Sequence, residues 1–446
     1  MTRRPLRSYD VRERNEKLVL QIIYRERGIS QSEVAQQTGL KPPTVFRIFS
    51  QLESDGVICE CTPERGTLPT KGRKPAYYCV VPDSVYTIGI DFWSGSAAVV
   101  VSDFAGTAVH SEVLDVAARA EGNVTGETML EEISALVRRS IEQSELSPER
   151  LLGIGVGAPG IVDIESGTVV RYPRIPGLDG SSIKKRLEEE FGWPVYVHNN
   201  TAVIALGEYR YGAAAGYQSV VASLVRSGVG GAFLKDGRIL TNRGRTVLEI
   251  GHIVLDPNGP PCSAGWRGCV ESYLSEEALS AALRRAGYAG LDEAEAEAEH
   301  IDVDSGAPAA GGPAAGGPDG TGGADAADAG DRGGAGGRAA DPKGARRRAA
   351  VLARFSEASP ELDEAARRFA QVVHNLSNLL NPEAYLIVSR YRWVSEFLAG
   401  AVDHYRDADS PGLSEGAAAV LAETYDPLLA CRGAADLVLD HFFEER

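Results

Sequence analysis

Two short segments decide how the rest of the sequence is interpreted: EIGH at residues 249–252 and CSAGWRGCVE at residues 262–271. His252 ends the first segment, and Cys262 and Cys269 lie in the second. The second segment predicts a tight, glycine-rich loop. What the two segments mean depends on the patterns of strands, helices and charge on either side of them.

The charge of the chain is divided unevenly. The chain has 446 residues and a net charge of −16, but residues 1–80 hold 14 Lys and Arg against 9 Asp and Glu. The remaining residues hold 32 basic and 53 acidic side chains. A small basic head on an acidic body predicts that the head makes any contact with nucleic acid.

Length and composition exclude several classes of protein. The chain is long enough for two or three packed domains. Its longest apolar runs, 219–225 and 385–389, have the length of strands, so we expect no membrane span. The basic N-terminus has no apolar core behind it, so we expect no signal peptide. Six cysteines are too few for a disulfide framework, which favours a reduced, cytoplasmic protein.

The head has the pattern of a helix-turn-helix. Residues 11–26 carry apolar side chains, Leu18 and Ile22 among them, at helical spacing, and the segment from Ser30 to Glu33 is a capping box for a second helix. Gly39 is placed for a tight turn, and a third helix starts at Pro42 and runs to about residue 54. Ala35, Gly39 and Val45 have the spacing of two helices that cross closely.

Exposed residues at the start of the third helix are the candidates for reading DNA. Two strands, 57–61 and 76–81, would follow this helix and enclose a cationic wing at 62–75. The alternative is a dimerisation or protein-binding module, and the cationic wing residues would then be solvated charges. We interpret Cys59 and Cys61 as packing residues of the wing and not as metal ligands. The predicted DNA-binding residues are Lys41, Pro43, Thr44, Arg47, Lys71 and Arg73.

The body alternates strand-like runs with glycine turns and helical patterns. Such runs occur at 86–91, 97–103, 152–160, 195–200 and 218–225, and the last is followed by the glycine turn 227–231. In this order, behind a winged helix-turn-helix and ahead of the EIGH and cysteine segments, they resemble the ROK family of repressors, open reading frames and kinases. The resemblance covers the chain except residues 306–344, which are almost wholly Gly, Ala, Asp and Pro and are predicted to be a disordered surface loop.

The resemblance implies an α/β fold. Residues 1–82 would form a MarR-like winged helix-turn-helix, and residues 83–200 and 201–446 two lobes of the actin/hexokinase-like, ribonuclease-H-type ATPase fold. The final helix would return toward the first lobe, and the disordered insertion would span residues 301–345. A sugar would bind between the lobes.

Four features of the family's kinases are altered. The first phosphate turn keeps Asp91 but continues with bulky Phe92 and Trp93, and Arg226 replaces a glycine of the second. Ser389 and Arg390 stand where a nucleotide-binding Gly-Gly is usual. The catalytic aspartate is replaced by Asn200, which cannot act as a general base near neutral pH. These changes predict a protein that does not transfer phosphate.

The family's sugar-binding positions are altered less in this chain than its kinase features. Carboxylates, amides and histidine can bind vicinal hydroxyls, although Glu249 and Glu271 could also be solvated charges. Arg174 and Arg226 add positive charge, which would suit a phosphorylated or acidic sugar; the alternative is that they pair with acidic residues of the body. The resemblance assigns the sugar to Gly160, Asn199, Asn200, Glu249, His252 and Glu271.

The resemblance also assigns zinc to His252 and three cysteines, of which Ala264 replaces the middle one. Cys262 and Cys269 remain, and with water as a fourth ligand they would bind zinc more weakly. Packing of Trp266 is an alternative means of fixing this loop without a metal.

These observations predict a sugar-responsive repressor of genes for carbohydrate uptake or catabolism. We expect a homodimer or dimer of dimers on double-stranded operator DNA, with residues 369–380 and 434–443 as interface or hinge helices. The alternatives are an active sugar kinase with a DNA-binding head and a constitutive DNA-binding protein with a vestigial sugar pocket.

Overall fold

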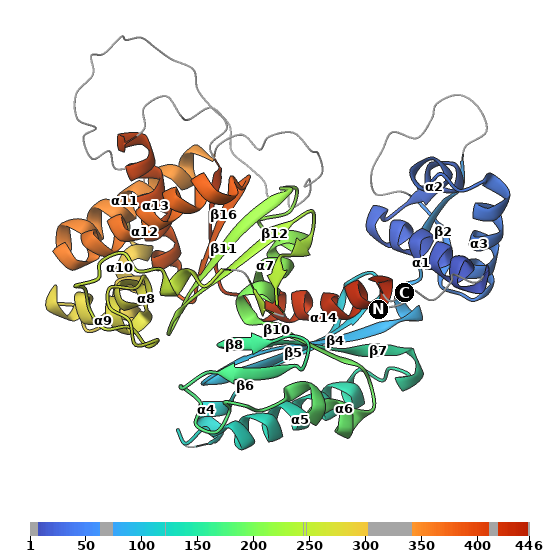
Figure 1. Cartoon of the computed structure of the whole chain (residues 1–446), viewed down its shortest axis with the longest axis horizontal. Coiled ribbons are helices and arrows are strands. Elements are labelled where there is room, and N and C mark those ends of the chain that lie inside the picture. Colours follow the sequence, from blue (N-terminus) through green and yellow to red (C-terminus); the bar gives the residue numbers. More distant parts are fainter. Residues whose placement is uncertain are drawn as a thin grey trace, which may run out of the picture.

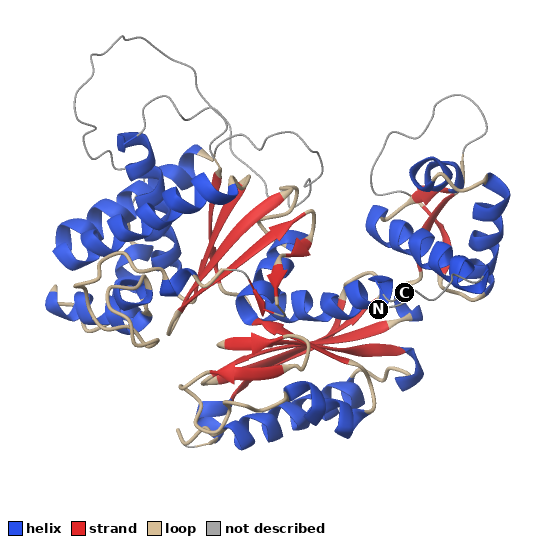
Figure 2. Cartoon of the chain, in the orientation of Figure 1, coloured by secondary structure: helices blue, strands red, loops and turns tan. Residues whose placement is uncertain are grey.

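The computed structural model describes residues 8–62, 75–120, 122–243, 245–246, 248–301, 341–409 and 418–444. Within them the chain forms a small helical unit followed by two α/β units (Figures 1 and 2). No helix among these residues is long and apolar enough to cross a membrane.

The first unit is a winged helix-turn-helix. It contains α1 (Ser8–Glu26), α2 (Gln31–Thr38) and α3 (Pro42–Ser54), with a sheet of order β1-β3-β2 formed by Ile29–Ser30, Tyr77–Val80 and Ile58–Cys61. The capping box is confirmed, because Glu33 N–H donates to Ser30 Oγ and Ser30 N–H to the Glu33 carboxylate. Gly39 ends α2 with φ of +69°, which glycine adopts without strain.

Two expectations for this unit are corrected. The buried face of α1 is formed by Val19 and Ile23, whereas Leu18 is 39% exposed, because the helix is rotated by one residue from the predicted face. Cys61 forms a disulfide with Cys79 instead of serving as a packing residue, since β2 and β3 pair and bring the two cysteines together.

The second unit is built on a five-stranded sheet of order β10-β7-β4-β5-β6. The strands β4, β5 and β6 are antiparallel, and β7 and β10 run parallel to β4. Helices α5 (Gly126–Gln143) and α6 (Ile183–Phe191) cover one face, and α14 (Pro427–Glu444) crosses the other (Figure 1). In sequence order the strands are Tyr86–Trp93, Ser96–Asp103, Ala108–Asp115, Leu151–Ala158 and Val195–Asn199.

Glycines in two strands allow α14 to approach the sheet. A Cβ atom on Gly89 would lie 1.8 Å from the Cys431 carbonyl oxygen, and one on Gly155 would lie 1.8 Å from that of Ala434. Larger residues at these positions would push the helix away. The last helix of the chain is therefore an integral layer of the unit that begins at β4.

The third unit repeats this topology with the sheet order β13-β12-β11-β16-β17. Strand β11 (Ser219–Val225) pairs antiparallel with β12 (Val229–Lys235) and parallel with β16 (Ala384–Ser389), which pairs with β17 (Ala419–Thr424). Strand β13 (Arg238–Ile239) completes the sheet. The larger helices that pack on it are α9 (Glu276–Arg285), α10 (Leu291–Glu299), α11 (Pro342–Ala358), α12 (Pro360–Leu380) and α13 (Arg392–Asp409). The mixed α/β class is confirmed.

Short elements connect the units. Around the first sheet lie η1 (Pro82–Ser84), α4 (Val116–Arg119), η2 (Pro148–Arg150), β8 (Ile161–Asp163) and β9 (Thr168–Arg171). Helix α7 (Asn200–Tyr211) leads to the second sheet, followed by β14 (Thr241–Asn242), β15 (Arg245–Thr246), η3 (Ile250–His252) and α8 (Glu271–Leu274).

Two further expectations differ from the structure. The predicted insertion was extended to residue 345, but α11 begins at Pro342, because the Asp341 side chain accepts from Lys343 N–H and proline fits the first helical turn. Residues 302–340 lie outside the described residues. Most apolar residues of 369–380, Phe369 among them, are buried inside the third unit, whereas Leu379 is 78% exposed.

Candidate functional site: a recognition helix and the edge between two sheets

The predicted DNA-facing residues lie at the start of α3. Lys41 is the N-cap residue, and Lys41, Pro43 and Arg47 are exposed whereas Thr44 is half-buried. On the opposite side, Val45, Ile48, Phe49 and Leu52 pack into the core of the unit. The other two candidates, Lys71 and Arg73, lie outside the described residues.

Phe46 was missed by the sequence analysis. Its side chain is 61% exposed on the same side of α3 as Arg47. The buried spacing 45, 48, 49 and 52 already placed residue 46 on the outer face, so the helical period was the signal that could have found it. An apolar side chain at this place can contact the methyl group of thymine in a major groove.

Three of the predicted sugar-binding residues lie at the carboxyl ends of two adjacent parallel strands, β7 and β10. Asn199 caps α7 by accepting from Thr201 N–H at 2.9 Å, and its amide donates to the Gly160 carbonyl at 2.7 Å. Gly160 has φ of +76°, and a Cβ there would lie 2.3 Å from the Arg171 carbonyl oxygen. Asn200 is the first, buried residue of α7.

The other three predicted sugar-binding residues lie in the third unit. Glu249 is the N-cap of η3 and His252 is its last residue, and His252 N–H donates to the Glu249 carbonyl at 3.0 Å. Glu271 begins α8, and its carboxylate accepts from the Ser263 hydroxyl. A Cβ on Gly228 would lie 2.8 Å from Glu271 Oε2, which places this carboxylate beside the turn between β11 and β12.

Contacts join the two groups of residues. Thr201 of α7 packs against Gly230 of β12, where an added Cβ would lie 2.1 Å from Thr201 Oγ1. Arg171 donates to the Ser263 carbonyl at 3.2 Å, and Arg174 to the Ser227 carbonyl. The strand ends of one sheet therefore face the glycine turn and cysteine loop of the next unit.

His198 precedes the two asparagines and stays neutral. Burial, and secondly the charge of His441, lowers the pKa of His198 to about 4. Its Nδ1 accepts from Asn199 N–H at 2.8 Å. The ring thus orients the backbone of Asn199 without adding charge.

The turn that contains Arg226 is closed by side chains. Arg226 is 4% exposed, and its guanidinium lies 3.7 Å from the Tyr425 ring centroid and 5.4 Å from that of Trp93. Asp91 Oδ2 accepts from the Tyr425 hydroxyl at 2.6 Å and lies 3.8 Å from Arg226 Nη2. Burial raises the Asp91 pKa to about 6, although Arg226 and Tyr425 both act to lower it. For Arg226, the structure favours pairing with an acidic residue over a role in gripping an anionic ligand.

Comparison with known proteins agrees with this architecture. The sequence model of the ROK family matches residues 87–311, and a winged helix-turn-helix DNA-binding model matches residues 12–58. The chain belongs to the ROK family.

Repressors and kinases are both found among the ROK relatives. The xylose repressor of Caldicellulosiruptor bescii is 27% identical over 65% of this chain and 70% of its own length. The N-acetylglucosamine repressor of Escherichia coli O157:H7 is 26% identical over 60% of this chain and 64% of its own length. The glucokinase of Thermotoga maritima is 34% identical, but over 37% of this chain and 53% of its own.

Solved ROK structures share the fold. A ROK transcriptional regulator described as a homologue of the E. coli MLC protein superposes with a TM-score of 0.67 at 19% identity, covering 97% of both chains. A ROK glucokinase from Streptomyces griseus, in complex with glucose and AMPPNP, has a TM-score of 0.56 at 24% identity and covers 80% of this chain and 99% of its own.

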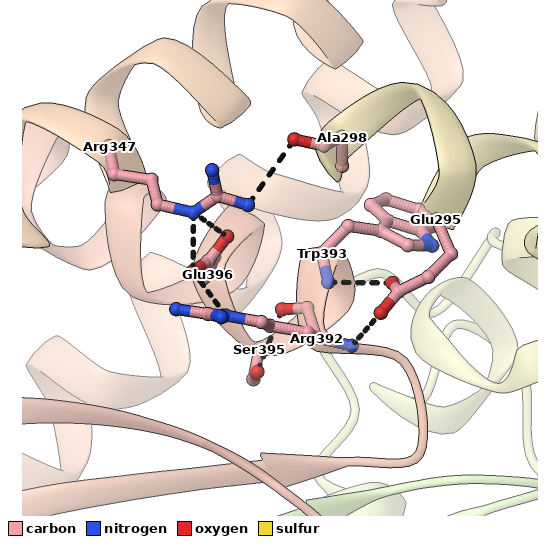
Figure 3. A network of polar contacts seen from close by, with 7 residues as sticks. All are labelled: Glu295, Ala298, Arg347, Arg392, Trp393, Ser395 and Glu396. Atoms are coloured by element: carbon pink, nitrogen blue, oxygen red, sulfur yellow. Dashed lines mark hydrogen bonds and ion pairs between the residues drawn. The ribbon is translucent and has the colours of Figure 1, made fainter. Parts of the chain in front are cut away.

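Shortly after the altered Ser389 and Arg390, at the start of α13, the chain supplies its own anion. Figure 3 shows the Glu295 carboxylate accepting from the backbone N–H groups of Arg392 and Trp393, each at 3.0 Å. Arg347 and Arg392 both pair with the buried Glu396. A helix N-terminus favours anions such as phosphate, and here that place is taken by a side chain.

The predicted metal ligands lie together. One ligand atom from each of His252, Cys262 and Cys269 lies within 4.8 Å of the others, and Cys262 Sγ is 3.4 Å from His252 Nδ1. At the fourth position, Ala264 offers its N–H to Cys262 Sγ at 3.4 Å. These three residues fit a zinc ion with one outside ligand. Trp266 is 66% exposed, so the expectation that it packs to fix the loop is wrong.

Proposed function

We propose that this ROK protein is a sugar-responsive DNA-binding regulator, acting as a repressor of carbohydrate genes. The observation that carries the proposal is a winged helix-turn-helix attached to a ROK body. In this body Arg226 pairs with Asp91, and Glu295 caps α13, at places where the resemblance predicts phosphate binding. The names of the repressor relatives support the same function.

The proposed DNA contact is made by α3 and the wing. Lys41 and Arg47 would contact phosphates or guanine, Pro43 and Thr44 would fix the approach of the helix, and Phe46 would contact thymine. Lys71 and Arg73 of the wing would enter the minor groove. Two copies of the chain would bind a pseudo-palindromic site as a homodimer.

The proposed sugar site is formed by the two groups that face each other across α7 and β12. The amides of Asn199 and Asn200 and the carboxylates of Glu249 and Glu271 can each bind hydroxyl groups, and Gly160 lets the backbone approach the ring. His252 would hold zinc through one nitrogen and present the other to the sugar. Zinc, where bound, would fix the cysteine loop.

The protein would bind sugar without phosphorylating it. Asn200 cannot remove a proton from a hydroxyl group at neutral pH. On the proposed nucleotide side, Arg226 packs against both Trp93 and Tyr425 beside Asp91, and these contacts would compete with a bound nucleotide. Asn200→Asp would therefore not restore transfer by itself.

A continuous set of contacts would couple the sugar to the DNA. Asn199 and Asn200 lie at one end of α7, and at its other end Arg210 pairs with Asp436 of α14 at 3.0 Å and with Asp440 at 2.5 Å. The far end of α14 contacts α1, where the Tyr24 ring lies tilted against the Phe443 ring with their centroids 5.7 Å apart. Tyr24 also stacks on Phe104 at 5.6 Å, after β5. A sugar that prefers one position of α7 would thereby change the position of the DNA-binding unit.

The test is operator affinity at fixed salt, with and without a panel of sugars. The duplex would be selected by the full-length chain from a random pool. We expect at least one sugar to change affinity about tenfold, a coupling of about 1.4 kcal/mol. A chain that binds DNA with equal affinity in every sugar would contradict the proposal, as would turnover of ATP with a hexose.

A further inference from the structure

Three cysteines share the outer face of the hairpin that follows the recognition helix. The register of β2 and β3 places Cys59 opposite Cys79 and Cys61 opposite Tyr77. Because side chains alternate along a strand, Cys59, Cys61 and Cys79 all point to the same side. Cys61 and Cys79 form a disulfide with their Cα atoms 5.9 Å apart, while Cys59 is an exposed free thiol.

The other face of this hairpin carries the core contacts. Ile58, Tyr78 and Val80 are buried, and the Tyr78 ring meets Phe49 of α3 edge-on at 5.1 Å. The disulfide lies outside this core, so the packing of the unit does not depend on the bridge. Breaking it would leave the helix-turn-helix folded.

A disulfide is unusual in a protein that binds DNA inside a reducing compartment. Proteins that act in a reducing compartment seldom keep disulfides, and those that occur there are mostly transient or redox-sensing. An exposed third thiol directly opposite Cys79 gives small thiols and disulfides a route for exchange. Both features distinguish this bridge from a permanent structural link.

We propose that Cys61 and Cys79 are a site of reversible thiol oxidation by a low-molecular-weight disulfide. In the reaction, one cysteine thiolate attacks the small disulfide and releases one small thiol, and the second cysteine displaces the other. The two protein thiols are oxidised to one disulfide, and one small disulfide is reduced to two thiols. An excess of the small thiol reverses both steps.

The proposed DNA-binding function gives the oxidation a consequence. The bridge joins Cys61 and Cys79, and the sequence between them contains the cationic residues Arg65, Lys71, Arg73 and Lys74. A covalent link between the ends of a segment reduces the number of conformations open to it, and so the entropy that binding can cost. The bridged form should therefore bind operator roughly three- to tenfold more tightly than the reduced form.

The first experiment measures the thiols and needs no DNA. The full-length chain is reduced, equilibrated with defined ratios of oxidised and reduced glutathione, alkylated and analysed by peptide mass spectrometry. We expect Cys61 and Cys79 to be bridged at oxidising ratios and released at reducing ones, while buried Cys431 remains a thiol. Cys59→Ser should still form the bridge. If Cys61 and Cys79 remain alkylatable at every ratio, or stay bridged at every ratio, the site is not a reversible one.

The second experiment compares operator affinity of the two forms, on a duplex selected by the reduced chain. We expect tighter binding after oxidation in the wild type and in Cys59→Ser, and no response in Cys79→Ser or in the double variant Cys59→Ser/Cys61→Ser, in which no second thiol faces the remaining cysteine. Circular dichroism of the serine variants checks that the unit is folded. A bridge that forms and leaves affinity unchanged would overturn the regulatory role. If neither form selects any duplex, the proposed DNA-binding function fails, and the thiol data still decide the oxidation site.

Discussion

The proposed nucleotide side and the proposed sugar side of the ROK body differ in how their polar side chains are bound. On the proposed nucleotide side, Asp91, Arg226 and Tyr425 bind one another, and Glu295 caps α13. On the proposed sugar side, the Asn199 amide bonds to the Gly160 carbonyl and the Thr201 N–H, and the Glu271 carboxylate accepts from the Ser263 hydroxyl. Amide and carboxylate groups of this kind have capacity for further hydrogen bonds. The comparison indicates that the first set of side chains is structural and the second is available to a ligand.

The largest expected effect tests the structural set. Arg226→Ala should lower the free energy of unfolding by about 3–5 kcal/mol, because Asp91 would stay buried without its cation. Glu271→Ala, the control on the sugar side, should change it by less than about 1 kcal/mol. Both are measured by urea denaturation with Trp fluorescence, and equal losses would remove the distinction between the two sides.

The contributions of Asp91 and His198 to the free energy of unfolding should change with pH in opposite directions. Burial raises the Asp91 pKa from 3.8 to about 6, so the stabilisation from this group is present below pH 4 and is lost as pH rises through about 6. Burial lowers the His198 pKa from 6.5 to about 4, so its contribution is present above pH 6.5 and is lost as pH falls through about 4. Each effect amounts to about 3 kcal/mol.

The check is the unfolding free energy between pH 4 and 7 for the wild type, Asp91→Asn and His198→Asn. The stability of the wild type relative to Asp91→Asn should decrease as pH rises, and that relative to His198→Asn should increase. Two differences that change in the same direction would show that burial does not govern both groups.

A substitution on the proposed sugar side should lower the affinity for the sugar, and one on the proposed nucleotide side should not. Glu271→Gln should weaken the effective sugar about 10- to 100-fold, since hydrogen bonds to a charged group contribute about 1.5–3 kcal/mol. Glu276→Gln is the matched control, because Glu276 pairs with Arg390 on the nucleotide side. Titration calorimetry measures both, and a larger loss in the control would reverse the assignment.

The smallest effects concern the DNA-binding unit. Phe46→Ala should weaken operator binding by about 1 kcal/mol without changing its salt dependence, because no phosphate contact is lost. Lys41→Ala should reduce the slope of log affinity against log salt by about 1. Binding isotherms at several salt concentrations separate the two, and identical slopes for Lys41→Ala and the wild type would place Lys41 away from the phosphates.

Local sequence rules predicted the fold well where neighbouring residues decide it. The Ser30–Glu33 capping box and the Gly39 turn depend on contacts within four residues, and both are confirmed. The face of α1 was shifted by one residue, since its rotation depends on Phe104 and α14, which are distant in sequence. The disulfide was missed for the same reason, because it depends on the register of two strands separated by the wing.

The candidate site, like the fold, could be predicted from the sequence only where short motifs or the helical period specify it. Family motifs identified the positions around Asn199 and Glu271, whose roles remain predictions, and the helical period could have supplied Phe46. No local pattern indicated that Arg226 would be covered by Tyr425, about 200 residues later, or that Glu295 would cap α13. Both contacts join segments that are distant in the sequence, so they become visible only in the structure.

The most direct test of the account is calorimetric titration of the full-length chain with Mg-ATP and, separately, with the sugar that changes operator affinity. The account predicts stoichiometric binding of the sugar and no binding of ATP, because the phosphate positions are filled from within. Stoichiometric binding of ATP, with or without the sugar, would contradict it.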